Sequence, residues 1–221
     1  MVKTGERIAL LLPDLRGGGA ERVFMNLASN FIRRGFSVEF ILMQAKGELL
    51  SKVPQGANII DLEAPRIRNA FWPLVKYLRQ NKPDALLIGM WPLTIIGTLA
   101  HRLSRSPGRV VVSDHNNLSS TPQANSWLKR LSLRVTMLFV YPLADSRITV
   151  SQVVARDLGK LSGLSMDRFQ VIYNPVVSND SDATETDSVE RGYDGKRILS
   201  VGSFKTQKDH ATLIRAFAQI D

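Results

Sequence analysis

The 221-residue sequence contains no cysteine. A disulfide framework and a cysteine-ligated metal site are therefore excluded, and cysteine usage says nothing about the redox compartment. The amino terminus has little apolar sequence. Its run at residues 8–12 is too short for the core of a signal peptide and far too short to span a bilayer. We therefore expect a cytoplasmic protein.

Acidic residues are scarce: 20 Asp and Glu face 29 Lys and Arg, a net charge of +9. The positive excess lies in residues 1–178, and between positions 101 and 134 the only acidic residue is Asp114. The basic residues of that stretch are Arg102, Arg105, Arg109, Lys129, Arg130 and Arg134. Such a cluster attracts nucleic acid, anionic lipid or phosphorylated substrates, and a solvated face without a partner is also possible. The basic and aromatic interleaving of a single-strand binder is missing, so we expect no nucleic-acid partner.

Three consecutive glycines, Gly17, Gly18 and Gly19, follow the first apolar run. A dinucleotide fingerprint fails because Arg22 occupies the place of its third glycine, and no Gly-Lys-Ser/Thr follows to make a P-loop. A glycine-rich turn before a helix nevertheless exposes backbone N–H groups at the positive end of the helix dipole. The pattern predicts either a phosphate-binding turn or a tight turn without a ligand.

Short apolar runs alternate with segments of helical periodicity along most of the chain. The predicted strands are 7–13, 37–43, 58–62, 84–90, 109–113, 147–150 and 169–173, and the predicted helices are 20–32, 71–80, 92–103, 127–143 and 152–161. This alternation is typical of a parallel sheet covered by helices on both faces. The predicted fold class is α/β, a Rossmann-like doubly wound sheet.

A composition shift predicts a domain boundary near residue 178. Residues 179–195 are polar and acidic and are expected to form a linker, followed by a strand at 196–201 and a helix at 209–219. One strand and one helix cannot enclose a core. We therefore expect residues 1–178 to form one domain and 196–221 to be the first βα unit of a second, incomplete domain. Its apolar residues Leu213 and Phe217 predict association between copies.

Three segments resemble Glycosyltransferase Family 4, retaining enzymes of the GT-B fold. They are GGGAERV at 17–23, ITVSQVVARDLGKLSGLSMDRFQVIYNPV at 148–176, and ILSVGSFKTQKDHATLIRAFAQI at 198–220. The resemblance implies an acceptor-side first domain and the opening of a donor-side second domain. It implies transfer of a hexosyl unit from a nucleotide-diphosphate sugar, with retention, to a saccharide or lipid-linked acceptor in surface polysaccharide or glycolipid synthesis. The chain alone is expected to be inactive.

The resemblance also assigns residues. Gly18 and Gly19 would lie against the donor diphosphate. The family places an arginine after the glycine corresponding to Gly202 and a lysine five residues further on; here these positions hold Ser203 and Lys208, so the phosphate clamp is weakened. His115, in the loop after the strand RVVVS, would contact the transferred sugar as the catalytic-site residue. Asn116 and Asn117 would bind acceptor hydroxyls or merely cap the next segment.

No metal and no cofactor are expected, because the resemblance implies that lysine, backbone amides and a helix dipole stabilise the leaving diphosphate. A non-catalytic module that binds a nucleotide or sugar phosphate is the alternative function. An NAD(P)-dependent oxidoreductase is disfavoured by the missing third glycine.

The predicted helix at 127–143 combines apolar residues with Lys129, Arg130 and Arg134. This combination suits contact with an anionic membrane surface at the inner face of the membrane. Residues 135–141 are apolar almost all round, which favours burial in the core instead. The sequence leaves both interpretations open.

Overall fold

The computed structural model describes residues 5–120, 127–174, 198–202 and 208–219. The chain divides into two units, Met1–Val177 and Ser178–Asp221. Each unit is described by itself below.

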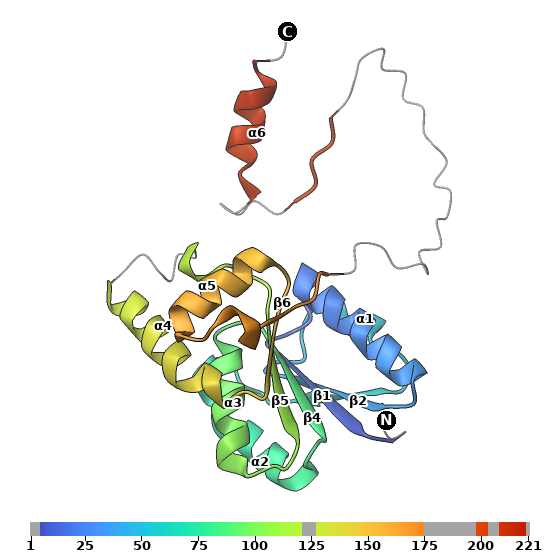
Figure 1. Ribbon diagram of the computed structural model, residues 1–221. Helices are drawn as coiled ribbons and strands as arrows, with labels where there is room; N and C mark the ends of the chain where they lie inside the picture. The colour runs from blue at the N-terminus through green and yellow to red at the C-terminus, as the bar shows by residue number, and fades with distance from the viewer. Residues whose placement is uncertain (1–4, 121–126, 175–197, 203–207, 220–221) are drawn as a thin grey trace, which may run out of the picture. The chain divides into compact units, whose positions relative to one another are not determined.

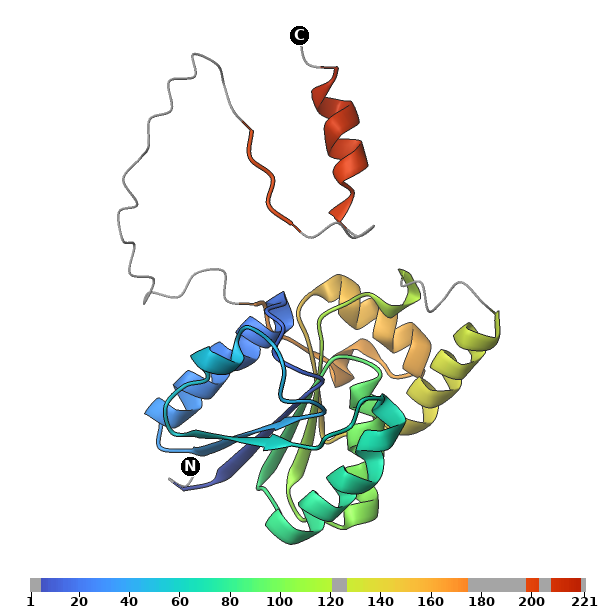
Figure 2. The same ribbon diagram turned by 180° about the vertical axis from the view of Figure 1, so that it is seen from behind.

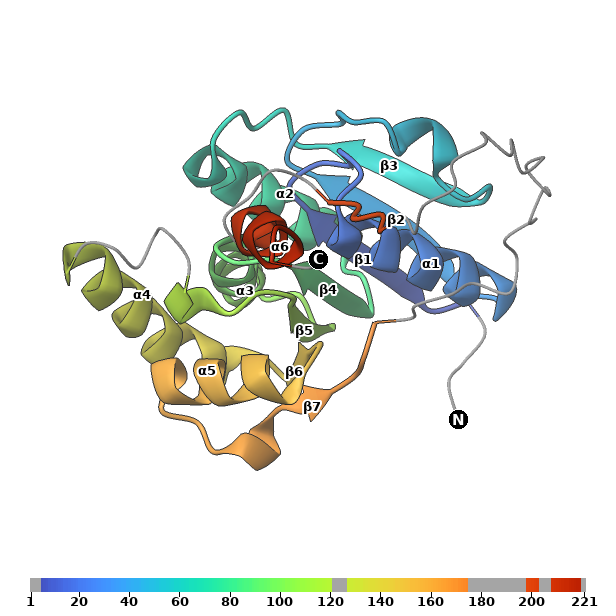
Figure 3. The same cartoon turned by 90° about the horizontal axis from the view of Figure 1, so that it is seen from above.

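The first unit is built on one parallel sheet of seven strands in the order β3-β2-β1-β4-β5-β6-β7. Figure 3 shows this order from above, from β3 at one edge to β7 at the other. The strands are β1 Arg7–Leu12, β2 Ser37–Leu42, β3 Ala57–Asp61, β4 Ala85–Gly89, β5 Arg109–Asp114, β6 Ser146–Thr149 and β7 Gln170–Val171. The central strands are almost continuously apolar because helices cover both of their faces.

Five helices cover this sheet: α1 Gly19–Arg33, α2 Phe71–Asn81, α3 Leu93–Ser104, α4 Trp127–Val140 and α5 Gln152–Ser162 (Figure 1). Helix α1 packs on one face, where Phe24 and Ala28 meet Leu10 and Phe40. The buried residues of α2, α3, α4 and α5 belong to a second core on the other face. Figure 2 shows α1 on one side of the strands and α2 with α3 on the other. The predicted fold class is confirmed.

Two predicted elements of the first unit are each three residues shorter than expected. The helix predicted at 127–143 ends at Val140, and a single 3-10 turn, Tyr141–Leu143, follows it. Pro142 stands in this turn and lacks the N–H that a continuing α-helix would need. The strand predicted at 169–173 is reduced to Gln170–Val171 at the edge of the sheet.

In the second unit the predicted helix is present as α6, His210–Phe217, and the side chain of Asp209 caps it by accepting from Thr212 N at 3.3 Å. The predicted strand at 196–201 is wrong over the residues described, since 198–202 have no strand structure. A strand needs a hydrogen-bonded neighbour, and no described strand pairs with this segment. Ile198, Leu199 and Val201 are exposed accordingly.

Candidate functional site

The order of the strands places a topological switch point between β1 and β4. From β1 the sheet continues through β2 and β3 on one side, and from β4 through β5, β6 and β7 on the other. In open α/β sheets, ligands bind at the carboxyl ends of the strands flanking such a point. The glycine turn follows β1, Met90 and Trp91 follow β4, and the loop with His115 follows β5. The fold thus collects the predicted residues of the first unit at one edge.

The three glycines have different roles in the turn. Gly17 has φ +94°, a conformation that side-chain-bearing residues rarely adopt, and a Cβ there would collide with the carboxylate of Glu48. A Cβ at Gly18, the residue before α1, would collide with the carboxylate of Glu21, whereas a Cβ at Gly19 would meet open space. No side chain caps this helix end. An anion would therefore find open backbone at Gly19 and negative charge next to Gly17 and Gly18.

His115 is half-buried directly after β5 and lies against α1, the helix that begins at the glycine turn. Its ring centroid is 6.2 Å from that of Phe24, with the two rings tilted by 49°. Nε2 lies 3.3 Å from Ser113 Oγ, and the buried Nδ1 has no hydrogen-bond partner among the described residues. Burial lowers the pKa of His115. The imidazole is therefore neutral at pH 7 and presents one nitrogen to hydrogen bond a ligand.

The two asparagines after His115 differ in burial. Asn116 is exposed, whereas the Oδ1 atom of Asn117 is buried and has no hydrogen-bond partner in the described part of the chain. Two contacts fix the loop. Leu118 is buried in the core, and the carboxylate of Asp157 on α5 accepts a hydrogen bond from Ser119 N at 3.1 Å. Sequence reasoning missed Asp157, although a charged residue among the core-facing positions of α5 was a usable signal.

Asp114, the last residue of β5, is fully buried next to His115 in the sequence. Its carboxylate accepts hydrogen bonds from the Tyr141 hydroxyl and from the backbone N–H of Trp91. Tyr141 Oη also lies 3.3 Å from Thr94 Oγ1. Burial raises the pKa of Asp114 to about 6, against the lowering effect of both hydrogen bonds. The sequence places Asp114 beside the site but does not indicate this pairing.

Two further polar atoms at the same edge were not predicted. Trp91 Nε1, after β4, and Thr149 Oγ1, at the end of β6, are buried without a hydrogen-bond partner among the described residues. Buried polar atoms are normally hydrogen-bonded, so unpaired ones indicate a missing ligand or water. With His115 and Asn117, they bring donors and acceptors to the ends of β4, β5 and β6.

The remaining predicted residues belong to the second unit. Lys208 is exposed directly before the Asp209 cap of α6, and a Cβ on Gly202 would lie 3.5 Å from Lys208 Cγ. The structure therefore brings Gly202 and Lys208 together within this unit. Ser203 lies outside the described residues.

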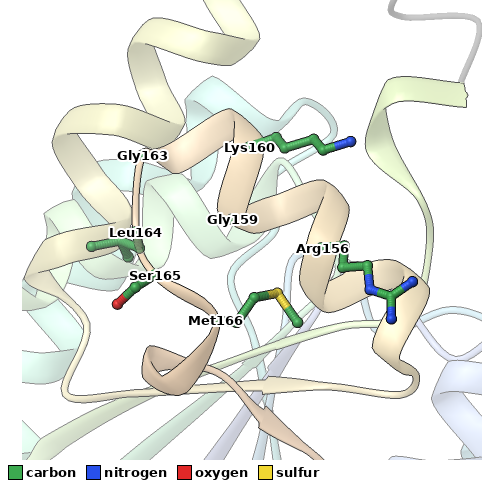
Figure 4. Close-up of a pocket in the computed structure, with 7 residues that line it drawn as sticks. All are labelled: Arg156, Gly159, Lys160, Gly163, Leu164, Ser165 and Met166. Atoms are coloured by element: carbon green, nitrogen blue, oxygen red, sulfur yellow. The ribbon is translucent and has the colours of Figure 1, made fainter.

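A separate pocket of about 480 Å³ lies along the carboxyl-terminal half of α5. Figure 4 shows Arg156 and Lys160 extending from α5, and Ser165 and Met166 on the segment that follows it. None of the predicted site residues lines this pocket.

Among the described residues, no three His, Asp or Glu side chains are grouped so that they could hold a metal ion. None of the helices that the structure describes is both long and apolar enough to cross a bilayer.

Comparison with solved structures identifies the class of this fold. Anabaena Alr3699/HepE in complex with UDP-glucose matches with a TM-score of 0.57 at 20% identity, over 76% of this chain and 43% of that one. The apo form of the lipopolysaccharide outer core galactosyltransferase WaaB matches with a TM-score of 0.52 at 16% identity, over 77% of this chain and 46% of that one. The first unit is a Rossmann-like domain like those of GT-B glycosyltransferases.

The chain belongs to Glycosyltransferase Family 4, whose family model matches residues 17–179. A Campylobacter jejuni protein, N-acetylgalactosamine-N,N'-diacetylbacillosaminyl-diphospho-undecaprenol 4-alpha-N-acetylgalactosaminyltransferase, is 24% identical over 228 residues. That alignment covers 97% of this chain and 60% of the relative. The chain thus spans about three-fifths of this curated relative and under half of the solved structures above.

Proposed function

We propose that this chain forms the acceptor-side domain, and part of the donor-side domain, of a glycosyltransferase. The enzyme transfers a hexosyl unit, with retention, from a nucleotide-diphosphate sugar to a saccharide or lipid-linked acceptor in surface polysaccharide or glycolipid synthesis. Family membership favours this activity over a non-catalytic module that binds a sugar phosphate. The UDP-glucose bound by the Anabaena protein and the undecaprenol-linked substrate named for the Campylobacter protein support the two substrate classes.

The observation that carries the proposal is the neutral, half-buried His115 against α1 at the switch point of the sheet. A neutral imidazole accepts or donates a hydrogen bond to a sugar hydroxyl without bringing charge near the reacting carbon. The unpaired atoms of Trp91, Asn117 and Thr149 offer further hydrogen bonds to a polyhydroxylated ligand at the same edge. We assign Asn116 and Asn117 to acceptor hydroxyls and His115 to the transferred sugar.

The donor diphosphate is assigned to the backbone at Gly18 and Gly19 together with Lys208, with Ser203 in the place of the family's arginine. The open space at Gly19 supports a close approach of the backbone to phosphate, while Glu21 has to turn away from Gly18 to admit it. The lysine charge and the dipole of α1 stabilise the leaving diphosphate, and the proposal assigns no metal and no cofactor.

The proposed location of the enzyme is the cytoplasmic face of a membrane, where a lipid-linked acceptor is anchored. The undecaprenol-linked substrate named for the Campylobacter relative and the net charge of +9 support this location. We also propose self-association, supported by the exposure of Leu213, Ile214 and Phe217 on α6. A strictly monomeric mass by light scattering at about 100 μM would contradict self-association.

The proposal is tested with the full-length protein in two steps. Ligand-observed NMR with UDP, GDP, dTDP and their sugar conjugates identifies the donor, and transfer to an acceptor pool is then followed by mass spectrometry. His115→Ala is expected to reduce kcat/KM at least about a hundredfold, while the exposed Lys52→Ala control stays within about twofold. If His115→Ala and Lys208→Ala both left the transfer rate unchanged, the site assignment would be contradicted. If the protein bound a donor but transferred sugar to no acceptor, the proposed activity would be contradicted.

A further inference from the structure

Helix α4 presents apolar side chains on two opposite faces. Leu133, Met137 and Val140 are buried against the core. Its other large apolar residues are exposed, led by Trp127 at 71% and Phe139 at 68%. The complete exposed set is Trp127, Leu128, Leu131, Val135, Leu138 and Phe139, which we call the α4 outer face.

The periodicity of the helix places this face opposite the buried one. At about 100° per residue, the six residues of the α4 outer face occupy one arc of roughly 120°, and the centre of the buried face lies about half a turn away. An α-helix that only covers a sheet exposes polar residues on its far side, so an apolar far side indicates a further contact.

The charges beside this face indicate what the contact is. Lys129, Arg130 and Arg134 are exposed on α4, and the helix contains no Asp or Glu. Arg130 and Arg134, one turn apart, lie on one side of the apolar arc, and Lys129 lies beyond the opposite side of the arc. Cations bordering a broad apolar face match the interface of a bilayer with anionic lipids, where apolar residues enter the acyl boundary and Lys and Arg meet phosphates.

We propose that the α4 outer face docks the protein on an anionic bilayer. A second copy of the chain is a poorer occupant, because pairing this face with itself would bring two basic borders together. The inference rests on the proposed function in one respect: a lipid-linked acceptor lies in a membrane, so an enzyme that uses one works there.

Docking through α4 also orients the candidate site. Tyr141 directly follows α4 and donates a hydrogen bond to Asp114, the residue before His115. Helix α4 also packs on α5, which holds the loop after His115 through Asp157 and Ser119. A bilayer touching α4 is therefore next to the elements that carry the acceptor loop, an arrangement that suits an acceptor anchored by a lipid.

The test is flotation of the purified chain with vesicles of phosphatidylcholine, with and without phosphatidylglycerol. The unmodified chain is expected to float only with the anionic vesicles. Trp127→Ala combined with Phe139→Ser is expected to weaken binding at least about tenfold. The matched control is Trp72→Ala on α2, which removes a tryptophan that is 67% exposed elsewhere and should leave binding unchanged.

Charge is tested by a second matched pair. The double variant Arg130→Glu with Arg134→Glu should abolish binding to anionic vesicles. The control double variant, Arg66→Glu with Arg68→Glu, replaces two exposed basic residues ahead of α2. It changes the net charge by the same amount and should have little effect on binding. Equal loss in both charge pairs, or no flotation of the unmodified chain, would overturn the proposal. A dimer in sedimentation velocity that Trp127→Ala with Phe139→Ser dissociates would also overturn it, in favour of a second copy.

The docking proposal and the proposed function fail separately. Transfer to a water-soluble acceptor by the full-length enzyme needs His115 but not the α4 outer face, so Trp127→Ala with Phe139→Ser should leave that rate unchanged. Loss of this soluble activity would mean that the α4 outer face serves the catalytic fold instead of a membrane.

Discussion

The hydroxyl of Tyr141 donates a hydrogen bond to the carboxylate of Asp114, and both side chains are almost completely buried. This contact joins the turn after α4 to the last residue of β5, and the N–H of Trp91 adds the end of β4 to the same carboxylate. A single buried acid therefore connects the carboxyl ends of β4 and β5 to the turn after α4. Hydrogen bonds of this kind are strong in a low dielectric, while the buried charge itself is costly.

Replacing Asp114 by Asn is expected to stabilise the protein at neutral pH. Burial raises the pKa of Asp114 from 3.8 to about 6, so the folded chain holds this proton more tightly than the unfolded chain. Between these two pH values the free energy of unfolding falls as pH rises, by about 3 kcal/mol in total. Asp114→Asn keeps an acceptor for Tyr141 and removes the charge. Urea unfolding should show little difference from the unmodified chain near pH 4 and a gain of up to about 3 kcal/mol near pH 7.5; a loss at pH 7.5 would refute the assignment.

His115 is expected to take up its proton only below the usual pKa of 6.5, because burial disfavours the imidazolium. The unfolded chain then binds this proton more readily, so the contribution of His115 to stability is complete above pH 6.5 and is lost as pH falls below it. An NMR titration of chain labelled in its three histidines measures the midpoint directly. The same titration in urea is the control and should return the usual value. A folded-state midpoint above 6.5 would contradict the neutral imidazole on which the site depends.

The loop after His115 should loosen when Asp157 loses its carboxylate. Asp157→Ala removes the acceptor of Ser119 N, so the free energy of unfolding should fall by about 1.5–3 kcal/mol. The Ser119 amide should exchange with deuterium at least about tenfold faster. Asp157→Asn, which retains an acceptor oxygen, is the matched control and should lose less than half as much. Unchanged exchange in the alanine variant would mean that Leu118 alone holds the loop.

Two alanine substitutions in the glycine turn are expected to have different effects on stability. Gly17→Ala should lower the free energy of unfolding by about 1–2 kcal/mol, because alanine disfavours φ +94° and its Cβ collides with Glu48. Gly19→Ala meets open space at the start of α1 and should leave stability unchanged or raise it by up to about 1 kcal/mol. Chemical denaturation compares them. A folded Gly19→Ala variant that binds the donor as well as the unmodified protein would remove Gly19 from the diphosphate site.

Much of the fold could be predicted from the sequence because it depends on local patterns. The strand RIALLL at Arg7–Leu12 is buried on both faces, and its run of apolar residues shows this without knowledge of its neighbours. Helix α1 has the periodicity of one covered face, and Gly35, with φ +84°, follows its end. The predicted strand at 196–201 had the right composition, but strand structure also requires a partner, and composition does not supply one.

The candidate site divides in the same way. Sequence patterns indicated the glycine turn and the loop of His115, because parallel strands bring their carboxyl ends to one edge. The pairing of Asp114 with Tyr141, the support of Ser119 by Asp157 and the unpaired Trp91 Nε1 depend on residues tens of positions apart, so they were not predicted.

Helix α4 shows most clearly what the sequence determines and what the tertiary structure decides. By itself the sequence predicted a helix over 127–143 that combines apolar residues, almost all round in its second half, with Lys129, Arg130 and Arg134. Only the packing against the sheet decided that Leu133, Met137 and Val140 are buried while Trp127 and Phe139 face outward. The reason is physical: hydrophobic burial has no direction of its own, so the placement of the other elements selects which apolar face of a helix meets the core.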